Sequence, residues 1–541
     1  MKWEPRTLSA NLSLQARQRG AQQALVTQDA STSWRDLEAQ AIRVAKALLA
    51  HGVRRGDFVG LLCGNDEHWV ASFYGAALIG AVTVPVNTRF KAAEIEYCLR
   101  QSDVRLLILA DRFLKIDFMA FLREVEPAVD QALPGQALPL LDNVVVIGED
   151  VPHAGLDWFA FLDAGAAVSD DVLAEAMRCV TPFDLLLIQF TSGTTAHPKG
   201  VMLTHDNMLR NATAVGRRLG IEASDRYFNC RPFFHVAGST LSLLCALCAG
   251  ACIVTLPTFE PGAALTMLAD ERCTFISGND TIFQMLMAHA SFDRTRLHLR
   301  GGWAAAGPDT MRRIIDEMGI DKICWAYGLS EASPNVAIND WRDEESLRVG
   351  GFASPHDGVA VRIVDEASGH PCAAGEVGEI QVRGWGVMKG YYKQAEANAR
   401  VFTADDWLRT GDLGALRADG RLRLVGRLKD VFRVGGENVA PAEVEQVLLS
   451  HPAVATAQVV GVPDARLGEV PAAFVTLKPG QTLDAEALLA WSKPRMANFR
   501  IPRYAQVVTD FERIGMTASG KVQKNKLREH AIALFQLSGK P

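Results

Sequence analysis

Residues 191–200 of this chain read Thr-Ser-Gly-Thr-Thr-Ala-His-Pro-Lys-Gly. The segment follows the apolar run Leu185–Phe190 and precedes the helix-like stretch Asp206–Leu219. It holds four hydroxyl side chains, two glycines and one lysine. Glycines allow close approach to the backbone, consecutive N–H groups bind anions, and hydroxyls donate hydrogen bonds to phosphate oxygens. We therefore predict a phosphate-binding loop after a buried strand; a polar turn with this composition by chance is the alternative.

The same segment does not match a Walker A loop, which has the form G-x-x-x-x-G-K-[ST]. Counted from Gly193, Pro198 stands at the position of the second glycine. Gly200 stands at the position of the hydroxyl residue that binds Mg²⁺. A P-loop kinase or ATPase is therefore disfavoured.

Around this loop, segments with the period of a helix alternate with short apolar runs. A helical pattern at Trp34–His51 precedes the apolar run Phe58–Leu62, and a second one at Trp69–Ile79 precedes Ala81–Val86. Mostly apolar strands between helices are typical of a parallel sheet that is covered on both faces. The sequence therefore predicts an α/β fold with layered sheets.

The pattern changes twice in the C-terminal half of the chain. Between Gly350 and Arg383, alternating strands are separated by Gly and Pro turns, which indicates a small, mostly antiparallel, β-barrel-like region. After Arg427 the pattern becomes compact α+β. A chain of 541 residues is too long for one hydrophobic core. We predict a large N-terminal domain at residues 1–427 and a small C-terminal domain at residues 428–541.

The composition of the chain excludes several classes of protein. The net charge is −6, which disfavours binding to nucleic acid or anionic lipid over a broad surface. The ten cysteines lack a disulfide-like spacing, and we interpret Cys245 and Cys248 as core residues, with a metal or redox pair as the alternative. The apolar run Leu241–Leu256 is too short for a membrane span, and no signal peptide begins the sequence. These features predict a cytoplasmic protein with reduced thiols.

Residues 191–200 resemble the signature of the adenylate-forming superfamily, which contains acyl-CoA synthetases, peptide-synthetase adenylation domains and beetle luciferases. The usual form is T-S-G-T-T-G-x-P-K-G, and Ala196 replaces the third glycine here. The resemblance implies a loop that binds the phosphates of ATP. It also implies a small C-terminal domain that rotates on a hinge. The residues that it assigns to the phosphates are Thr191, Ser192, Gly193, Thr194, Thr195 and Lys199.

Two further segments resemble motifs of the same superfamily. Phe233–Gly238 resembles its aromatic and histidine gate, in which His235 separates an acyl pocket from a thiol tunnel; a histidine that is satisfied within the core is the alternative. Residues 327–331, Tyr-Gly-Leu-Ser-Glu, resemble its Y-G-x-T-E motif. By resemblance, Tyr327 stacks on adenine, Ser330 donates to the α-phosphate and Glu331 binds Mg²⁺.

The segments on either side of the predicted domain boundary also match the superfamily. Asp412 stands where its members bind both ribose hydroxyls, a task that suits a carboxylate with two acceptor oxygens; a turn aspartate is the alternative. Arg427 resembles the second ribose contact, and Lys429 the hinge residue. Gly435 and Gly436 resemble the loop that lines the CoA tunnel after the C-terminal domain rotates.

Near the C-terminus, residues 517–521, Thr-Ala-Ser-Gly-Lys, resemble the catalytic-lysine motif of the superfamily. The resemblance places Lys521 between the carboxylate of the acid and the α-phosphate. These two anions repel each other, and opposite charge is needed where charge builds up in the transition state. We interpret Lys524 and Lys526 as surface charges. The residues with predicted catalytic roles are Lys521, His235, Glu331 and Ser330.

The motifs together predict an ATP-dependent acyl-CoA synthetase of the fatty-acid–CoA ligase branch. It would convert a carboxylic acid and ATP to acyl-AMP and pyrophosphate, and then form a thioester with CoA. The alternatives are an adenylating enzyme that loads a carrier-protein thiol or uses oxygen as acceptor, and a binding protein without activity. The resemblance further implies ATP, Mg²⁺ and CoA as ligands and a homodimer as one assembly of the chain, while the net charge predicts no nucleic-acid partner.

The acid itself is indicated by two features. Residues 383–392 resemble fatty-acyl and related CoA ligases. By resemblance, Trp303 stands at the wall of the acyl pocket, where relatives have a small residue, and its indole would shorten the pocket; a core tryptophan elsewhere is the alternative. The candidate substrates are medium- or long-chain fatty acids and aryl acids, and we expect a medium-length or aryl acid in preference to a very long chain.

Overall fold

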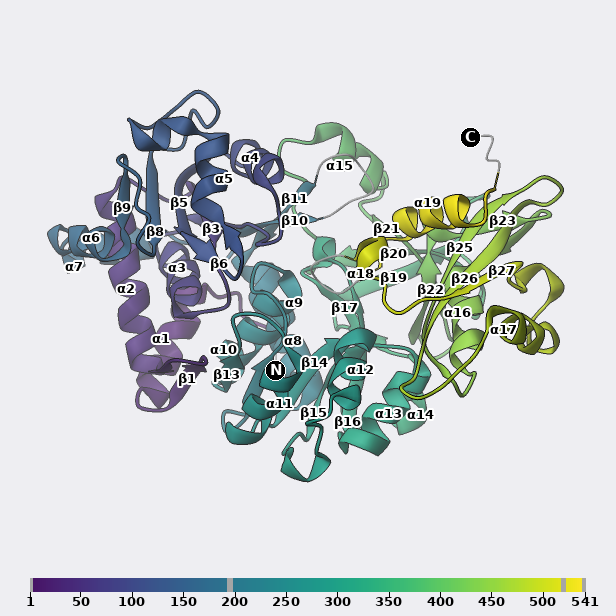
Figure 1. The fold of residues 1–541 in the computed structure, drawn as a ribbon. Coiled ribbons are helices and arrows are strands. Elements are labelled where there is room, and N and C mark those ends of the chain that lie inside the picture. The colour runs from purple at the N-terminus through teal and green to yellow at the C-terminus, as the bar shows by residue number, and fades with distance from the viewer. Residues whose placement is uncertain (1–2, 192–197, 517–521, 538–541) are drawn as a thin grey trace.

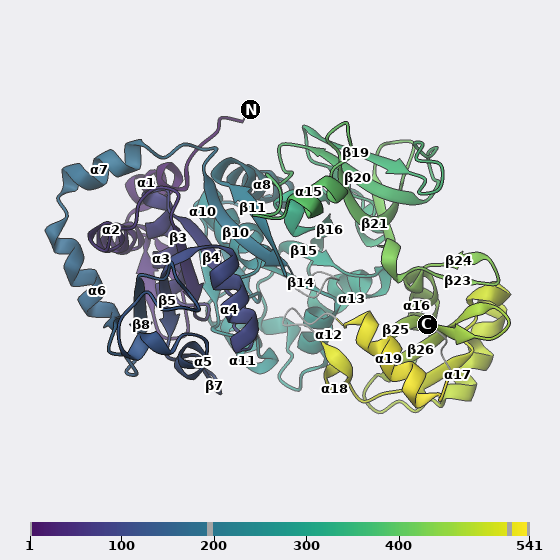
Figure 2. The same ribbon diagram turned by 90° about the horizontal axis from the view of Figure 1, so that it is seen from above.

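A computed structural model describes residues 3–191, 198–516 and 522–537 of the chain. Two large sheets and their helices form most of the N-terminal part (Figure 1). A four-stranded sheet follows, and a further sheet lies in the C-terminal part, to one side of the large sheets (Figure 2). This mixed α/β architecture with a small C-terminal α+β unit confirms the predicted fold class.

The larger sheet has the strand order β18-β17-β16-β15-β14-β12-β13-β1-β2. Its central strands, from β16 to β1, are parallel, and the other three are antiparallel to their neighbours. The strands are β1 Gln23–Val26, β2 Ser31–Ser33, β12 Arg226–Asn229, β13 Cys252–Thr255, β14 Phe275–Asn279, β15 Gly301–Ala305, β16 Lys322–Gly328, β17 Asn335–Ile338 and β18 Ser354–Pro355.

The second sheet has the order β11-β10-β4-β3-β5-β8-β9, and only β11 is antiparallel to its neighbour. The strands are β3 Phe58–Leu62, β4 Val82–Pro85, β5 Val104–Ala110, β8 Asn143–Ile147, β9 Gly155–Asp157, β10 Leu185–Thr191 and β11 Lys199–Thr204. Strand β11 was not predicted. It places a β-hairpin where the sequence suggested a loop that leads directly into a helix.

The remaining strands are antiparallel, except that β27 pairs with β26 in parallel. The four-stranded sheet consists of β19 Val359–Val364, β20 Gly378–Gly384, β21 Leu408–Leu416 and β22 Leu422–Arg427. The C-terminal sheet consists of β23 Phe432–Val434, β24 Glu437–Val439, β25 Val454–Asp464, β26 Gly468–Leu477 and β27 Tyr504–Val507. A small hairpin pairs β6 Arg112–Phe113 with β7 Ile116–Asp117.

Most of the helices pack against the large sheets, and α16 to α19 belong to the C-terminal part (Figure 1). The first seven are α1 Leu8–Arg19, α2 Trp34–Ala50, α3 Glu67–Leu78, α4 Ala92–Gln101, α5 Phe118–Val125, α6 Trp158–Ala164 and α7 Asp170–Arg178. The next seven are α8 His205–Leu219, α9 Val236–Gly238, α10 Cys245–Ala249, α11 Pro261–Asp270, α12 Asp280–Ala288, α13 Pro308–Met318 and α14 Glu345–Val349. The last five are α15 Ala395–Val401, α16 Pro441–Leu449, α17 Ala485–Ser492, α18 Glu512–Gly515 and α19 Lys524–Leu534.

The strands of the seven-stranded sheet are buried on both faces. In β5, Leu106 and Ile108 belong to the core that the two large sheets share, whereas Leu107 and Leu109 belong to a second core on the opposite face. Side chains alternate between the faces of a strand, so both faces must be apolar. This is the physical reason why β5 is a continuous apolar run in the sequence.

The C-terminal part has a hydrophobic core of its own, which runs from Phe432 to Ala531. It packs α16 and α19 against the C-terminal sheet and is separate from the two cores of the large sheets. Among the described residues, no helix has both the length and the apolar sequence that crossing a bilayer would require.

Candidate active site

The parallel strands β12, β14, β15 and β16 end at one edge of the nine-stranded sheet. In open α/β sheets, ligands bind beyond the carboxyl ends of the strands. The predicted residues Tyr327, Ser330 and Glu331 lie at or just after the end of β16, and His235 lies in the segment that follows β12. The fold therefore brings several of the predicted site residues to one edge.

A first group of contacts joins Tyr327, Asp412 and Arg427. The Tyr327 hydroxyl donates a 2.9 Å hydrogen bond to Oδ2 of Asp412, and Nε of Arg427 lies 3.3 Å from Oδ1 of the same carboxylate. Asp412 and Arg427 are direct cross-strand neighbours on β21 and β22. Burial and then the charge of Asp412 raise the pKa of Tyr327 well above its ordinary value. Three predicted nucleotide residues, distant in the sequence, thus form one network.

A second group joins Glu331, Tyr391 and Lys199. The Tyr391 hydroxyl donates a 2.9 Å hydrogen bond to Oε1 of Glu331. The Lys199 ammonium lies 4.9 Å from the centroid of the Tyr391 ring, which is a cation–π contact. Burial and then the charge of Glu331 raise the pKa of Tyr391. Tyr391 therefore connects the end of the predicted phosphate loop to the predicted Mg²⁺ ligand.

Tyr391 was not predicted from the sequence to be a site residue. The residue as a whole is 5% exposed, and its backbone is held against β11, where Val201 and Tyr391 form an isolated β-bridge. The only signal in the sequence was the motif Gly-Tyr-Tyr at residues 390–392. This motif does not indicate which residues the two tyrosines contact.

The phosphate loop begins and ends at paired positions of a hairpin. Thr191 at the end of β10 is opposite Lys199 at the start of β11, and the Thr191 hydroxyl donates a 3.4 Å hydrogen bond to the Lys199 carbonyl. Residues 192–197 lie outside the described residues, so the roles predicted for Ser192, Gly193, Thr194 and Thr195 stay predictions.

His235 is the N-cap residue of the short helix α9, and its Nδ1 accepts a 3.1 Å hydrogen bond from the Ala237 N–H. A π-helix, Ser239–Leu244, follows, a form that is frequent at functional sites. Asn65 fixes the segment before it: its Oδ1 accepts from the Phe233 N–H at 2.7 Å, and its Nδ2 donates to the Arg231 carbonyl at 2.8 Å. The predicted gate is thus anchored to the seven-stranded sheet.

The residues predicted to act in the transfer of the acyl group to CoA lie near the start of the C-terminal part. Lys429 lies in a short 3₁₀ helix, Leu428–Asp430, directly after β22, and burial followed by the charge of Arg427 lowers its pKa. Gly435 and Gly436 form the two-residue turn between β23 and β24, with φ of +60° and +96°. Two consecutive positive φ values are the geometry of a type I′ hairpin turn, which favours glycine at both positions.

Lys521 lies outside the described residues, but its flanks are fixed. Met516 and Val522 pair across an antiparallel bridge. The Lys524 ammonium forms an ion pair with Glu445 of α16 and donates a 2.8 Å hydrogen bond to the Val459 carbonyl. The prediction that Lys524 is a surface charge was wrong, because its side chain is only 20% exposed.

The C-terminal part contacts α13. A groove between them is lined by Asp309, Arg312, Arg313 and Asp316 on one side and by residues 449–452 and Lys478 on the other. The charge of Glu445 also acts on Asp280 at the start of α12, where burial raises the pKa of the carboxyl. The C-terminal part therefore lies beside the helices that follow β14 and β15.

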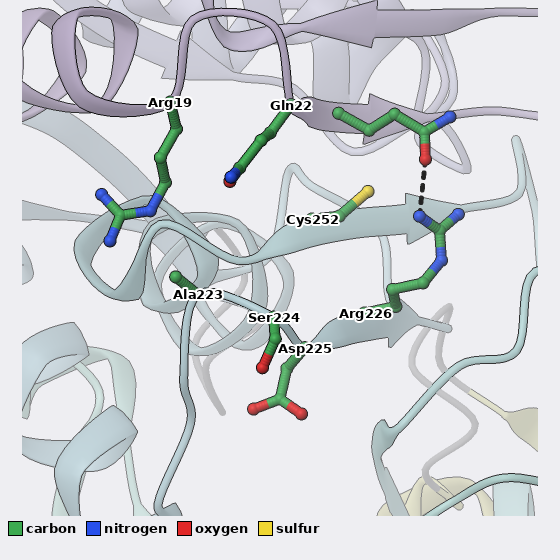
Figure 3. A pocket seen from close by; sticks show the side chains of 8 residues that line it. Arg19, Gln22, Ala223, Ser224, Asp225, Arg226 and Cys252 are labelled. Carbon is green, nitrogen blue, oxygen red and sulfur yellow. Dashed lines mark hydrogen bonds between the residues drawn. The ribbon is translucent and has the colours of Figure 1, made fainter.

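A pocket of about 470 Å³ lies at the opposite edge of the nine-stranded sheet, beside the amino ends of β1, β12 and β13 (Figure 3). Arg19, Asp225, Arg226 and Cys252 line it, and Arg226 donates a 2.6 Å hydrogen bond to Gln23. None of the predicted nucleotide residues that the structure describes lines this pocket. It is therefore separate from the candidate active site.

Comparisons with known proteins cover nearly the whole chain. The AMP-binding enzyme family matches residues 12–392, and the AMP-binding enzyme C-terminal domain matches residues 443–521. The chain is 38% identical to the putative acyl-CoA synthetase YngI of Bacillus subtilis (strain 168), over 92% of this chain and 91% of that protein. It is 33% identical to the mitochondrial medium-chain acyl-CoA ligase ACSF2 of Danio rerio, over 90% and 82%.

Among solved structures, the chain is similar to the anthranilate CoA ligase AuaEII in complex with anthranoyl-AMP. The TM-score is 0.84 at 27% identity, and the match covers 99% of this chain and all of that one (100%).

Proposed function

Because the chain belongs to the AMP-binding enzyme family of the adenylate-forming superfamily, we propose that the two groups of side chains described above bind one nucleotide. The chain is an AMP-forming acyl-CoA synthetase. It converts a carboxylic acid and ATP to acyl-AMP and pyrophosphate, and then transfers the acyl group to CoA. The proposals that follow concern the residues that carry out these steps and the acid that is used.

Asp412 accepts hydrogen bonds from the ribose hydroxyls, and Arg427 contacts the ribose beside it. The cross-strand pairing of these residues supports this proposal, since it holds the carboxylate and the guanidinium together at one point. Tyr327 contributes its ring face to adenine while its hydroxyl orients the carboxylate of Asp412. An Asp412→Asn variant should therefore bind ATP more weakly, with a raised KM for ATP; an unchanged KM would contradict the assignment.

In the first step, an oxygen of the acid's carboxylate attacks the α-phosphorus, the P–O bond to the β-phosphate breaks, and pyrophosphate leaves. Both reactants are anions, so cationic and hydrogen-bonding groups must stabilise the charge that builds up. Lys199 and the hydroxyls of residues 191–195 bind the phosphates, Ser330 donates to the α-phosphate, and Lys521 lies between the two anions. The cation–π contact of Lys199 supports this arrangement, because it fixes the ammonium at the start of β11.

Glu331 would hold Mg²⁺. Among the described residues, no group of three or more His, Cys, Asp or Glu side chains forms a ready cation site. A single carboxylate fits Mg²⁺ shared with a nucleotide, because this ion is commonly bound by one or two carboxylates, phosphate oxygens and water. When bound, the ion neutralises charge on the phosphates. The chain's own contribution is the orientation of Glu331 by Tyr391.

In the second step, the CoA thiol attacks the acyl carbonyl carbon and AMP leaves. We divide the chain into domains at residues 1–427 and 428–541, and propose that the second rotates about Lys429. The rotation moves Lys521 out of the active site and brings Gly435 and Gly436 towards it. His235 then moves aside and opens the tunnel for the thiol. The separate C-terminal core supports such a motion, since a domain with its own core can move as a unit. A Lys429→Pro variant should impair thioester formation far more than adenylation; equal losses would contradict the hinge.

We propose a medium-length or aryl acid as the substrate. Trp303 is the middle residue of β15 and is 4% exposed, and we propose that its buried indole forms part of the wall of the acyl pocket. Two similar proteins support the same proposal, since ACSF2 is a medium-chain acyl-CoA ligase and AuaEII is an anthranilate CoA ligase. The cytoplasmic location and the homodimer stay predictions.

The observation that carries the assignment is the network of Tyr327, Asp412 and Arg427 next to Glu331. Pyrophosphate release across a panel of carboxylic acids, with and without CoA, tests it. We expect release with medium-length or aryl acids, and a thioester only when CoA is present. Release that never depends on an added acid would refute the proposal, and product formed only with a carrier protein would favour a carrier-protein thiol as acceptor.

A further inference from the structure

Arg231 is a cation without a carboxylate partner in the described residues. It follows β12, and its guanidinium lies 5.1 Å from the centroid of the Trp303 ring. Its Nε is buried and has no hydrogen-bond partner among the described residues. Residues 192–197 and 517–521, which lie outside the description, contain no Asp or Glu. An arginine in such a place ordinarily has an anionic or acceptor partner, because desolvation of its charge is costly.

Three further polar groups lie on the same side of the nine-stranded sheet. The Tyr227 hydroxyl, the Ser277 hydroxyl and the Trp303 indole N–H are buried, and within the described part of the chain none makes a hydrogen bond of good geometry. The side chains of Ser277, Trp303 and Ser242 nevertheless lie close enough to the Tyr227 hydroxyl to interact with it. Ser277 and Trp303 are direct neighbours on β14 and β15, and Tyr227 pairs with the residue two positions before Ser277. Residues two apart on a strand share a face. The groups therefore form one polar patch inside an apolar core.

The electrostatics of the patch follow from its burial. Burial lowers the pKa of Arg231, and the neighbouring Cys230 and Tyr227 offset this effect. Burial raises the pKa of Tyr227, and the side chains of Ser277, Trp303 and Ser242 lower it again. The patch thus consists of two hydroxyls, one indole N–H and one cation, and it contains no carboxylate.

The polar patch lies close to residues that are predicted to take part in the reaction. Arg231 lies four residues before His235, at the carboxyl edge of the strands that also carries Tyr327. Asn65 fixes the Arg231 backbone at the same place where it fixes the predicted gate. Arg231 therefore connects the patch to the edge of the sheet that carries the candidate active site.

We propose that Arg231, Tyr227 and Ser277 bind an oxygen acceptor at the far end of the substrate acid. The inference rests on the proposed function of the same site and names its substrate class: acids with a second carboxylate or an oxo group distant from the reacting carboxyl. Both groups accept the hydrogen bonds that the patch offers. The carboxylate binds better, because a guanidinium donates to it through two parallel hydrogen bonds and neutralises its charge.

The test compares acids of equal length. For chains of six, eight and ten carbons, kcat/KM is measured for the unsubstituted acid, the acid with an oxo group at the penultimate carbon, and the dicarboxylic acid. The unmodified enzyme should prefer the dicarboxylic and oxo acids at one of these lengths by roughly 10- to 100-fold, since a hydrogen bond to a charged group has about this effect. Arg231→Met should abolish or reverse that preference.

Arg210→Met is the matched control. Arg210 also lies over an indole, with its guanidinium 4.6 Å from the Trp385 ring, and burial also lowers its pKa. It belongs to α8 and does not adjoin the patch, so the preference ratio should stay unchanged. If Arg231→Met does not fold, Tyr227→Phe tests the same point, and it should reduce the preference for the oxo acid.

The inference would be overturned by an unmodified enzyme that prefers the unsubstituted acid at every length, or by an Arg231→Met variant that loses kcat/KM equally for all acids. Equal turnover of all acids would also refute the inference but leave the proposed function intact. If the proposed function itself were wrong, the outcome would differ from all of these, because no acid would then support CoA-dependent pyrophosphate release.

Discussion

Replacing Tyr391 with phenylalanine removes one hydroxyl and leaves the ring in place. The hydroxyl donates to Oε1 of Glu331 at 2.9 Å, and the ring supports the Lys199 ammonium at 4.9 Å. Tyr391→Phe therefore separates two functions of one residue. It frees the predicted Mg²⁺ ligand from its orienting partner but retains the cation–π contact.

The expected magnitude follows from the burial of the two groups. A hydrogen bond to a charged group contributes about 1.5–3 kcal/mol. The donor is buried but Glu331 is only partly so, which places the loss near the lower end, about 1.5–2 kcal/mol. This corresponds to a roughly 10- to 30-fold weaker apparent affinity for Mg²⁺, within the range observed when partners of metal ligands are removed. Tyr391→Leu should also raise the KM for ATP, because it removes the contact with Lys199.

The assay is the Mg²⁺ dependence of pyrophosphate release at saturating acid and ATP, together with direct binding of Mg²⁺–ATP by equilibrium dialysis. Tyr392→Phe is the matched control, since the neighbouring tyrosine donates to Asp103 at 2.9 Å and not to Glu331. An Mg²⁺ activation curve of Tyr391→Phe that coincides with that of Tyr392→Phe would refute the proposed role of Tyr391.

Three further predictions concern the C-terminal lysines and two buried histidines. Lys521→Ala should lower the rate of acyl-AMP formation by roughly 10²–10³-fold, because a charge that stabilises the transition state is lost, and an unmodified rate would contradict its role. Lys524→Met should slow adenylation but not thioester formation from preformed acyl-AMP, since the ion pair with Glu445 positions the segment that carries Lys521; equal losses in both steps would indicate general destabilisation. Burial lowers the pKa of His205 to about 4 and that of His356 to about 3, whereas the unfolded chain binds these protons near the ordinary value of 6.5. The free energy of unfolding, measured in urea, should therefore fall as the pH decreases from about 6.5 towards 4, and less steeply in His205→Gln; a flat profile would contradict this reasoning.

The elements that the sequence predicted well have a strong local pattern. Helix α2 was predicted at Trp34–His51 and is observed at Trp34–Ala50, and Ser33 caps its first turn. Strand β11 was missed because its six residues directly follow the phosphate motif, where glycine and lysine obscure the strand pattern. Its extended conformation depends on pairing with β10, a contact that no local pattern specifies.

The residues that the sequence could not assign depend on partners far along the chain. Tyr391 contacts a glutamate 60 positions earlier, and Lys524 contacts a glutamate 79 positions earlier. A lone tyrosine or a lysine in a basic cluster has many equally plausible roles until its neighbours are known. Arg231 and Trp303 illustrate the same point. The motifs predicted that the Trp303 indole lies at a pocket wall, but they did not predict that the Arg231 guanidinium stacks on it.

The contacts of Lys524 also constrain how a rotating C-terminal domain could work. Both of its partners, Glu445 and Val459, belong to the C-terminal part, and so do Met516 and Val522, which pair on either side of Lys521. The catalytic-lysine segment is thus attached to its own domain at both ends. A rotation about Lys429 would carry Lys521 away without breaking these contacts. Under the proposed mechanism, these contacts are therefore kept in both half-reactions, and the rotation changes the contacts of the C-terminal part with α12 and α13.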